Sequence, residues 1–389
     1  MPLAILFPRF DHGAVEERYA SWQSELLLER ATDGAELIHY EPDELLSEVV
    51  AGLSQEFAVV VTDPLLLATR AAIDLLKRAL LDTGAPVAIP VSNEALRDDV
   101  RAALPESYLT IRQFEEMSGR MAARNDAPRV IDWSDGDPGL FLTRTSTLQA
   151  SRNHAHAALR GLRVAVAPSA YVHRWAPLRA QERLDLLGRV PTGAKSILEF
   201  GCAEGLLGGA IRKRQKCRVV GIELDREAAA QARKRLDDVY CGDVRELIPI
   251  IDQTFDFVIG GDILEHLDDP WSFLIELRRV VATDGQLLLS IPNVANWAIV
   301  SDLLRGRFDY SYIGITCAGH LRFFTKQTIT DALTIAGWEV ISIEAQAPII
   351  NREYEALLAS FVAAGVVHSA EELAAPGYYV VAKNRRRDS

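Results

Sequence analysis

Glycines and acidic side chains recur at the ends of apolar stretches in the C-terminal half of the chain. The run SILEFGCAEG at 196–205 carries Gly201 and Gly205, and Glu223 and Asp243 follow the next two apolar stretches. The two glycines permit a sharp turn and a close approach of a ligand to the backbone, because they lack a Cβ. A carboxylate after the second stretch can accept hydrogen bonds from both hydroxyls of a ribose, and one after the third can accept an adenine amine. These spacings indicate a nucleoside-binding edge.

A second group of side chains could move a proton or bind a metal. Asp262, Glu265 and His266 lie within five positions, and His320 follows in the stretch GHLRFF. Imidazole titrates near neutral pH, so either histidine suits a general base. Magnesium keeps waters and needs only one or two carboxylates, so the same four residues permit a magnesium ion but do not require one. We expect none. The alternatives are that His266 caps the helix that begins before Pro270 and that His320 anchors a loop.

Strands and helices must alternate to hold these residues. Helical spacing predicts helices over 206–216, 226–236 and 271–281. Alternation of this kind predicts an α/β, Rossmann-like fold with a mostly parallel seven-stranded sheet, whose ligands bind beyond the carboxyl ends of the strands. The strands are expected at 196–200, 218–224, 239–240, 256–259 and 286–291, with a closing antiparallel pair at 338–345 and 378–383.

The motifs resemble those of the class I S-adenosylmethionine (SAM)-dependent methyltransferases, in the subgroup near the ubiquinone-type O-methyltransferases. They are LEFGCAEG at 198–205 and GDILEHLDDP at 261–270. The blocks at 305–310 and 320–325 are similar to a segment of bacterial methyltransferases from polysaccharide-associated gene neighbourhoods. Ala203 stands where many relatives have a second glycine, a departure that should not exclude the cofactor. The resemblance implies a SAM site with Glu199, Gly201 and Gly205 at the methionine end, Glu223 at the ribose, Asp243 and Val244 at the adenine, Asp262 beside the reactive centre, and Cys202, Ala203 and Leu224 also in contact.

The segment 294–325 is longer than a simple connection and is rich in aromatic residues. We expect it to act as a lid over the acceptor, with His320 as general base and Arg322 pointing the same way to bind an acceptor phosphate or carboxylate. The alternatives are a flap that only packs and a dimer contact. Its aromatic residues are Trp297, Phe308, Tyr310, Tyr312, Phe323 and Phe324.

The N-terminal part also alternates and is expected to form a second α/β domain over 1–174, followed by the methyltransferase domain over 175–389. A helix is expected at 64–81, opened by Pro64. The stretches PGLFLTR at 138–144 and RVAVAPSAYVH at 163–173 resemble family 2 glycosyltransferases. Where those enzymes carry two metal-binding acids, VTDP has only Asp63, and Asp135-Gly-Asp137 lies in a turn. The domain is interpreted as a glycosyltransferase-like relic that binds or positions a glycan, the alternative being an unrelated α/β scaffold. Strands are expected at 3–7, 36–39, 58–61, 87–90, 139–143 and 163–167.

Composition limits the partners. The formal net charge of −12 disfavours nucleic acid, and the basic run at 385–387 is interpreted as a solvated tail. No apolar run is long enough to cross a membrane. The four cysteines lack CxxC spacing and indicate free thiols of a reducing cytoplasm.

The expected acceptor is a hydroxyl of a sugar or a glycan-linked small molecule. The alternatives are a quinone or phenolic O-methyltransferase and a non-catalytic SAM- or glycan-binding module; the oligomeric state stays open.

Overall fold

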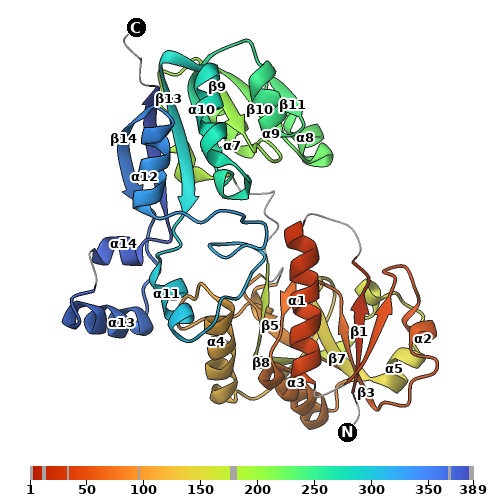
Figure 1. The fold of residues 1–389 in the computed structure, drawn as a ribbon. Helices are drawn as coiled ribbons and strands as arrows, with labels where there is room; N and C mark the ends of the chain where they lie inside the picture. Colours follow the sequence, from red (N-terminus) through yellow and green to blue (C-terminus); the bar gives the residue numbers. More distant parts are fainter. Residues whose placement is uncertain are drawn as a thin grey trace. The chain divides into compact units, whose positions relative to one another are not determined.

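The computed structural model describes residues 3–10, 15–32, 35–94, 97–175, 182–366 and 369–384. The chain divides into two compact units, Met1–Ala176 with Asp309–Ile313, and Pro177–Phe308 with Gly314–Ser389. Each unit has its own sheet and core (Figure 1). The basic run at 385–387 and the junction at 176–181 lie outside the described residues.

The second unit is built on a sheet with the strand order β11-β10-β9-β12-β13-β15-β14. The five strands from β11 to β13 pair in parallel. Strand β15 is antiparallel to both of its neighbours. Among the described residues this confirms the expected seven strands, the mostly parallel sheet and the closing antiparallel pair. The strands are β9 (Ser196–Phe200), β10 (Arg218–Glu223), β11 (Asp238–Cys241), β12 (Phe255–Gly261), β13 (Val281–Pro292), β14 (Trp338–Ala345) and β15 (Gly377–Asn384).

Both faces of this sheet are covered, which explains the continuous apolar runs of its central strands. Leu198 and Val220 belong to one buried apolar cluster, and their neighbours Ile197 and Val219 belong to another. The helices are α6 (Leu184–Leu187), α7 (Leu206–Arg214), α8 (Arg226–Ala232), α9 (Val244–Leu247), α10 (Pro270–Leu277), α11 (Trp297–Leu304), α12 (Lys326–Ile335), α13 (Arg352–Ala363) and α14 (Ala370–Ala374).

Acidic caps fix where the helices around the candidate site begin. Asp225 accepts from the amide of Ala228 at the start of α8 (2.8 Å), and Asp269 accepts from that of Ser272 at the start of α10 (3.0 Å). The interpretation of His266 as the cap of α10 is therefore wrong. The aspartate next to Pro270 takes that place, because its short carboxylate reaches the free amides of the first turn.

The first unit also carries a mixed sheet, with the order β2-β1-β3-β7-β5-β8-β4 and β6 on β8. Strands β1, β2 and β3 are parallel, whereas β7 is antiparallel to both β3 and β5. All six expected strands are present. They are β1 (Leu3–Pro8), β2 (Glu36–Tyr40), β3 (Phe57–Val61), β5 (Val87–Ser92), β7 (Leu140–Arg144) and β8 (Arg163–Arg174), to which the structure adds β4 (Leu66–Leu67) and β6 (Arg129–Asp132).

The helix expected to open at Pro64 begins later. Residues Leu66–Leu67 pair with β8 as the short strand β4, and the helix starts after Thr69, whose hydroxyl accepts from the amide of Ala72. Threonine is the stronger start signal here, because its side chain satisfies a free amide whereas proline only lacks one. The helices are α1 (Val15–Ala31), α2 (Leu46–Val49), α3 (Arg70–Thr83), α4 (Ile111–Arg124) and α5 (Thr145–Gln149).

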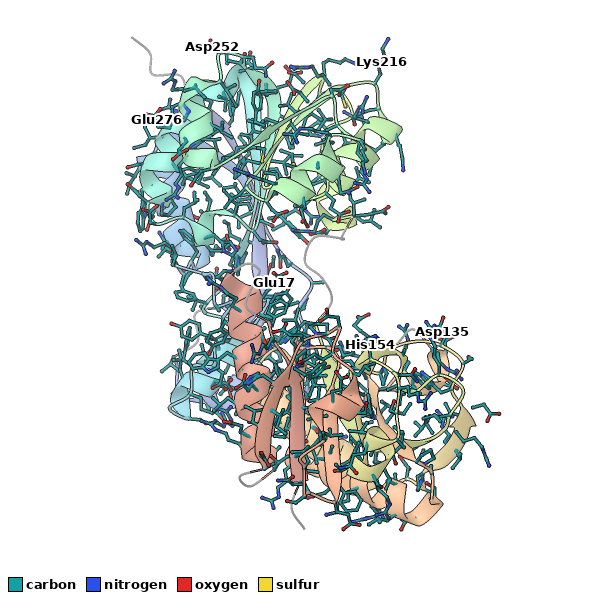
Figure 2. All side chains as sticks on the ribbon, turned by 90° about the vertical axis from the view of Figure 1, so that its right-hand side faces the viewer. Glu17, Asp135, His154, Lys216, Asp252 and Glu276 are labelled. Carbon is teal, nitrogen blue, oxygen red and sulfur yellow. The ribbon has the colours of Figure 1, made fainter. Side chains whose placement is uncertain are left out.

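Charged side chains of both signs lie on the outside of each unit (Figure 2), such as Lys216, Asp252 and Glu276 in the second and Asp135 in the first. None of the described helices has the length and apolar character that a membrane crossing needs. The four cysteines are unbonded to one another.

Candidate functional site

The turn after β9 requires glycine at two positions. Gly201 has φ +70°, and a Cβ there would lie 2.2 Å from Cδ1 of Ile263. Gly205 has φ +73° and precedes α7. The amides of Gly201 and Cys202 both donate to the carbonyl oxygen of Ile222, at 2.8 and 3.1 Å. The loop is therefore drawn tightly against the end of β10, at the carboxyl edge of the sheet.

Glu223 ends β10 and binds this loop. Its carboxylate accepts from the amide of Ala203 through Oε2 and from that of Asp225 through Oε1, both at 2.8 Å. Ala203 keeps φ +46°, so it adopts the left-handed conformation that glycine would take more easily. The next side chain, Leu224, is 70% exposed. An acidic edge followed by an open apolar surface fits a ribose with an attached base.

Asp243 follows β11 and caps α9. It accepts from the amide of Arg245 at 2.8 Å and pairs with the guanidinium of the same residue, which also pairs with Asp268. These hydrogen bonds hold the pKa of Asp243 below its ordinary value. The carboxylate thus stays ionised, as an acceptor for an adenine amine must; that contact stays a prediction. Val244 packs partly buried against the core.

Glu199 lies buried within β9, under the glycine turn. Burial raises its pKa to about 8, and a backbone hydrogen bond from Gly208 and the charge of Arg183 oppose this only in part. Its Oε2 has no hydrogen-bond partner among the described residues. A buried oxygen without a donor, beside a glycine turn, fits a site completed by a ligand that carries N–H groups. Cys202 is also buried, which raises the pKa of its thiol.

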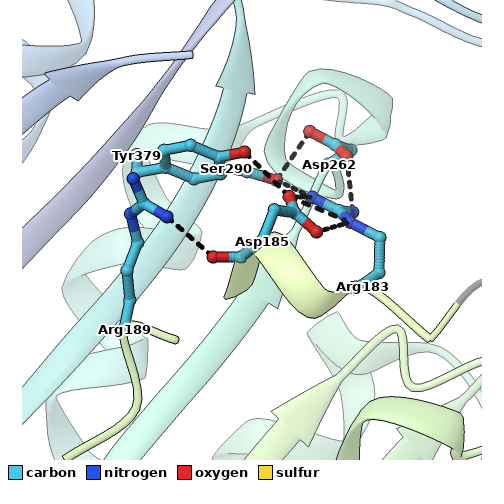
Figure 3. Close-up of polar contacts among 6 residues, drawn as sticks. All are labelled: Arg183, Asp185, Arg189, Asp262, Ser290 and Tyr379. Carbon is cyan, nitrogen blue, oxygen red and sulfur yellow. Dashed lines mark hydrogen bonds and ion pairs between the residues drawn. The ribbon is translucent and has the colours of Figure 1, made fainter. Parts of the chain in front are cut away.

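Asp262 directly follows β12 and has φ +55°. Its side chain lies beside those of Arg183 and Ser290 (Figure 3). Its Oδ2 accepts from Nη1 of Arg183 at 2.8 Å, and its Oδ1 accepts from the hydroxyl of Ser290 at 2.7 Å. Sequence reasoning missed both partners. Ser290 offered a weak signal, as a polar residue inside the apolar run of β13, but Arg183 offered none.

Glu265, His266 and His320 come together, with one ligand atom of each within 4.8 Å of the others. Asp262, the fourth candidate, is outside this group and pairs with Arg183 instead. Neither carboxylate oxygen of the fully buried Glu265 has a hydrogen-bond partner among the described residues. Burial and the charge of Asp262 raise the pKa of Glu265 well above its ordinary value.

The two imidazoles meet edge to face, with their ring centroids 4.8 Å apart. Nδ1 of His320 contacts the carbonyl oxygen of Ile315 (3.0 Å), and Nδ1 of His266 contacts that of Gly319 (3.1 Å). A carbonyl can only accept, so Nδ1 carries the hydrogen in both rings. Burial and the neighbouring His266 lower the pKa of His320 to about 4. The expected titration near neutrality is therefore wrong for His320 in this structure, since its site disfavours the charged ring.

The aromatic residues of 294–325 pack in different places, and the lid stays a prediction. Trp297 is buried and donates to the carbonyl of Ile349, and Phe324 belongs to the apolar core. Both pack against the nearest apolar surface, as large rings do. Tyr310 and Tyr312 belong to the first unit. Phe308 and Phe323 contact each other edge to face, and the ring of Phe323 lies 6.5 Å from that of His320.

Arg322 does not point with His320. Its guanidinium donates to the main-chain carbonyl of Asp268 and lies over the ring of Trp271. The expectation of an acceptor-binding arginine assumed an extended stretch. Instead the amides of Leu321 and Arg322 both donate to the carbonyl oxygen of Glu265, which turns the chain.

In the first unit the two acids that could resemble a metal site are both bound to Arg174. Its Nε donates to Asp63 at 2.9 Å, and its Nη1 donates to the main-chain oxygen of Asp137 at 2.8 Å. The carboxylate of Asp137 accepts from Thr62 and from the amide of Gly139. A guanidinium thus occupies the position beside these acids.

Comparison with known proteins bears on the second unit. Residues 198–289 match the sequence model of a methyltransferase domain. A protein of Mycolicibacterium smegmatis named "Probable S-adenosylmethionine-dependent methyltransferase" is 30% identical over 148 residues, which are 38% of this chain and 52% of the relative. The ubiquinone biosynthesis O-methyltransferase of Pseudomonas aeruginosa is 31% identical over 31% of this chain and 53% of its own. The chain thus spans about half the length of these relatives. A solved SAM-dependent methyltransferase of Archaeoglobus fulgidus is 15% identical, with a TM-score of 0.39 over 52% of this chain and 91% of its own.

The strand order of the second unit and the acids at its strand ends define a Rossmann-like class I methyltransferase fold. With the family match inside it, this unit is a class I SAM-dependent methyltransferase domain, and its cofactor is SAM.

Proposed function

We propose that the protein transfers the methyl group of SAM to a hydroxyl group of a sugar or a glycan-linked small molecule. The observation that carries the choice of oxygen is the group of Glu265, His266 and His320, in which Glu265 and His320 are buried and His266 is partly buried. An acceptor hydroxyl must lose its proton during transfer, and this group supplies the acceptors for it.

The cofactor supplies a methyl group on a positively charged sulfur. Glu199 and the turn at Gly201 and Gly205 would hold its methionine end, Glu223 and Leu224 its ribose, and Asp243 with Val244 its adenine. Asp262, fixed by Arg183, would lie beside the reacting methyl group. Acidic residues at this edge also favour a cationic cofactor electrostatically.

His320 is the proposed general base. Its Nδ1 is committed to Ile315, so Nε2 is the nitrogen that can take the proton. Glu265 Oε1 lies 3.9 Å from Nε2, and in its ionised form this carboxylate would stabilise the imidazolium that forms. In the resting protein His320 is neutral, which is the state a base needs.

A hollow in the first unit supports the role proposed for it, that of a glycosyltransferase-like relic that binds or positions a glycan. The hollow has a volume of about 390 Å³ at the carboxyl ends of β1 and β2. Arg9, Arg18, Trp22 and His39 are among its lining residues, and Trp22 is 64% exposed. An exposed indole beside arginines can stack on a sugar ring and bind its hydroxyl or phosphate groups. The pairing of Asp63 with Arg174 supports a binding role over metal-dependent transfer.

The experiment is a turnover assay with SAM and a panel of glycans, sugar nucleotides and catechols, in which S-adenosylhomocysteine is measured. We expect turnover with a glycan or sugar, and less of it at limiting SAM with the Glu223→Ala variant, whose SAM binding should be weaker by about 1.5–3 kcal/mol. Turnover only with catechols would favour the quinone or phenolic alternative, which the similarity to ubiquinone biosynthesis O-methyltransferases supports. SAM binding without turnover on any acceptor would favour a non-catalytic module.

A divalent cation is the second candidate for the same group, favoured by the unpartnered carboxylate of Glu265. One carboxylate and two imidazole nitrogens suit zinc or manganese better than magnesium. Metal analysis of the purified protein and turnover in EDTA test this. Bound metal with activity lost in EDTA and restored by manganese supports the cation, and full activity in EDTA assigns the group to proton transfer alone.

A further inference from the structure

Two residues with strained backbones are joined through their side chains at the candidate site. Arg183 has φ +45° and Asp262 has φ +55°, and they are two of the four non-glycine residues with positive φ in the described part of the chain. Neither residue type is free of strain in this conformation, and such strain persists only where the surroundings hold it. Nη1 of Arg183 donates to Oδ2 of Asp262 at 2.8 Å.

The guanidinium of Arg183 binds three partners at once (Figure 3). Its Nε donates to the carboxylate of Asp185 at 3.1 Å, and its Nη2 donates to Asp185 at 3.0 Å and to the hydroxyl of Ser290 at 3.1 Å. Ser290 in turn donates to Oδ1 of Asp262. A planar fork can serve these partners together, whereas the single ammonium of a lysine cannot.

Asp185, at the other end of this network, is hydrogen-bonded to the sheet. The hydroxyl of Tyr379, on β15, donates to Asp185 at 2.9 Å. The guanidinium of Arg189 lies 3.7 Å from the centre of the Tyr379 ring and pairs with Glu344 on β14 at 2.8 Å. These contacts connect the start of α6 to β14 and β15. They therefore hold Arg183 in place beside Asp262.

We propose that Arg183 is a positioning residue for the cofactor, which acts by fixing the carboxylate of Asp262. This inference rests on the proposed function. The side chain of Asp262 is 42% exposed, so without its partners it would be free to rotate and its backbone free to relax. Holding it before the cationic cofactor binds avoids the entropy cost of ordering it afterwards. The guanidinium of Arg183 is itself bound to protein acceptors and does not contact the cofactor.

A double-mutant cycle on SAM affinity, measured by calorimetry without an acceptor, tests this. The variants are Arg183→Lys, Asp262→Asn and the pair; asparagine is chosen because it tolerates positive φ. We expect each single change to weaken SAM binding about tenfold, as for hydrogen bonds to a charged group, and the pair to weaken it no further than Asp262→Asn alone. A loss of about a hundredfold in the pair, the product of the single effects, would overturn the proposal.

Decarboxylated SAM separates positioning from direct contact. The Arg183→Lys loss should persist with this ligand, whereas a loss that disappears would mean that Arg183 binds the carboxylate of SAM directly and would overturn the proposal. Arg218→Lys, in an exposed pair with Asp238, is the matched control and should not change affinity.

If Arg183→Lys does not fold, Asp185→Asn provides the second variant, since it loosens Arg183 and leaves both Arg183 and Asp262 in place. A several-fold loss of affinity in the folded Asp185→Asn protein supports the proposal, and unchanged affinity refutes it. Failure of the unaltered protein to bind SAM would instead refute the proposed function, so the two failures are distinct.

Discussion

Glu199 has its charge set by burial. With a pKa of about 8, raised by desolvation, it keeps its proton at neutral pH in the absence of a ligand. The folded protein therefore binds one more proton than the unfolded chain between about pH 5 and pH 8, since a free glutamate titrates near 4.3. The contribution of Glu199 to the free energy of unfolding must therefore fall as the pH rises through this window.

Glu199→Gln should remove this dependence. Urea unfolding from pH 5 to pH 8 should give slopes that differ between the two proteins by up to about 1.4 kcal/mol per pH unit, with the unaltered protein losing more stability as the pH rises. Glu227→Gln, an exposed residue of α8, should keep the original slope. An equal slope in the Glu199 variant would mean that this carboxyl is already ionised in the folded protein.

His320→Ala distinguishes a base from a loop anchor. If His320 takes the proton, the variant should bind SAM normally and turn over about 10²–10⁴-fold more slowly. If it only holds the loop through Ile315, the acceptor KM should rise and the thermal stability should fall, with turnover at saturation largely kept. Steady-state kinetics with both substrates varied, together with a melting curve, decide between these results. Metal analysis alongside shows whether the change also removes a ligand.

The turn between β9 and α7 is the element on which the cofactor site depends most. Gly201→Ala would place a Cβ 2.2 Å from Ile263 in a left-handed conformation. We expect the unfolding free energy to fall by about 2–3 kcal/mol. We also expect that SAM binding is no longer measurable. Gly209→Ala, inside α7, is the matched control, because the nearest atom to its Cβ is Cβ of Arg235 at 3.4 Å, an ordinary van der Waals contact. There, helix propensity predicts unchanged or slightly higher stability. A Gly201 variant that binds SAM normally would show that Ile263 moves aside at little cost.

The two units of the whole molecule have separate cores, and every proposed cofactor-binding residue belongs to the second. Arg174→Met removes the partner of Asp63 in the first unit, where both side chains are only 17% exposed. We expect a loss of about 2–3 kcal/mol in the stability of that unit and unchanged SAM affinity. Urea unfolding and calorimetry on the same variant provide both readings. A changed SAM affinity would show that the first unit influences the cofactor site.

Much of the second unit could be predicted from the sequence, because its signals are local. Alternating apolar runs gave the order of strands and helices, and glycines with acids at fixed offsets marked the carboxyl edge around Gly201 and Glu223. Helix starts are harder to predict where two signals compete. Thr69 prevailed over Pro64, and Asp269 over His266, since a side chain that satisfies a free amide decides the start.

The tertiary structure decided how residues distant in the sequence share one environment. Arg183 and Asp262 are 79 positions apart, and Arg183 and Ser290 are 107 apart, so no spacing rule connects them. Burial likewise set the protonation of Glu199 and His320, because the pKa depends on the solvent that the fold removes rather than on the residue type. The aromatic residues of 294–325 pack against different surfaces, because their positions depend on which apolar groups the fold brings near them. The sequence determined which side chains reach the edge of the sheet, while packing determined their charges and their partners.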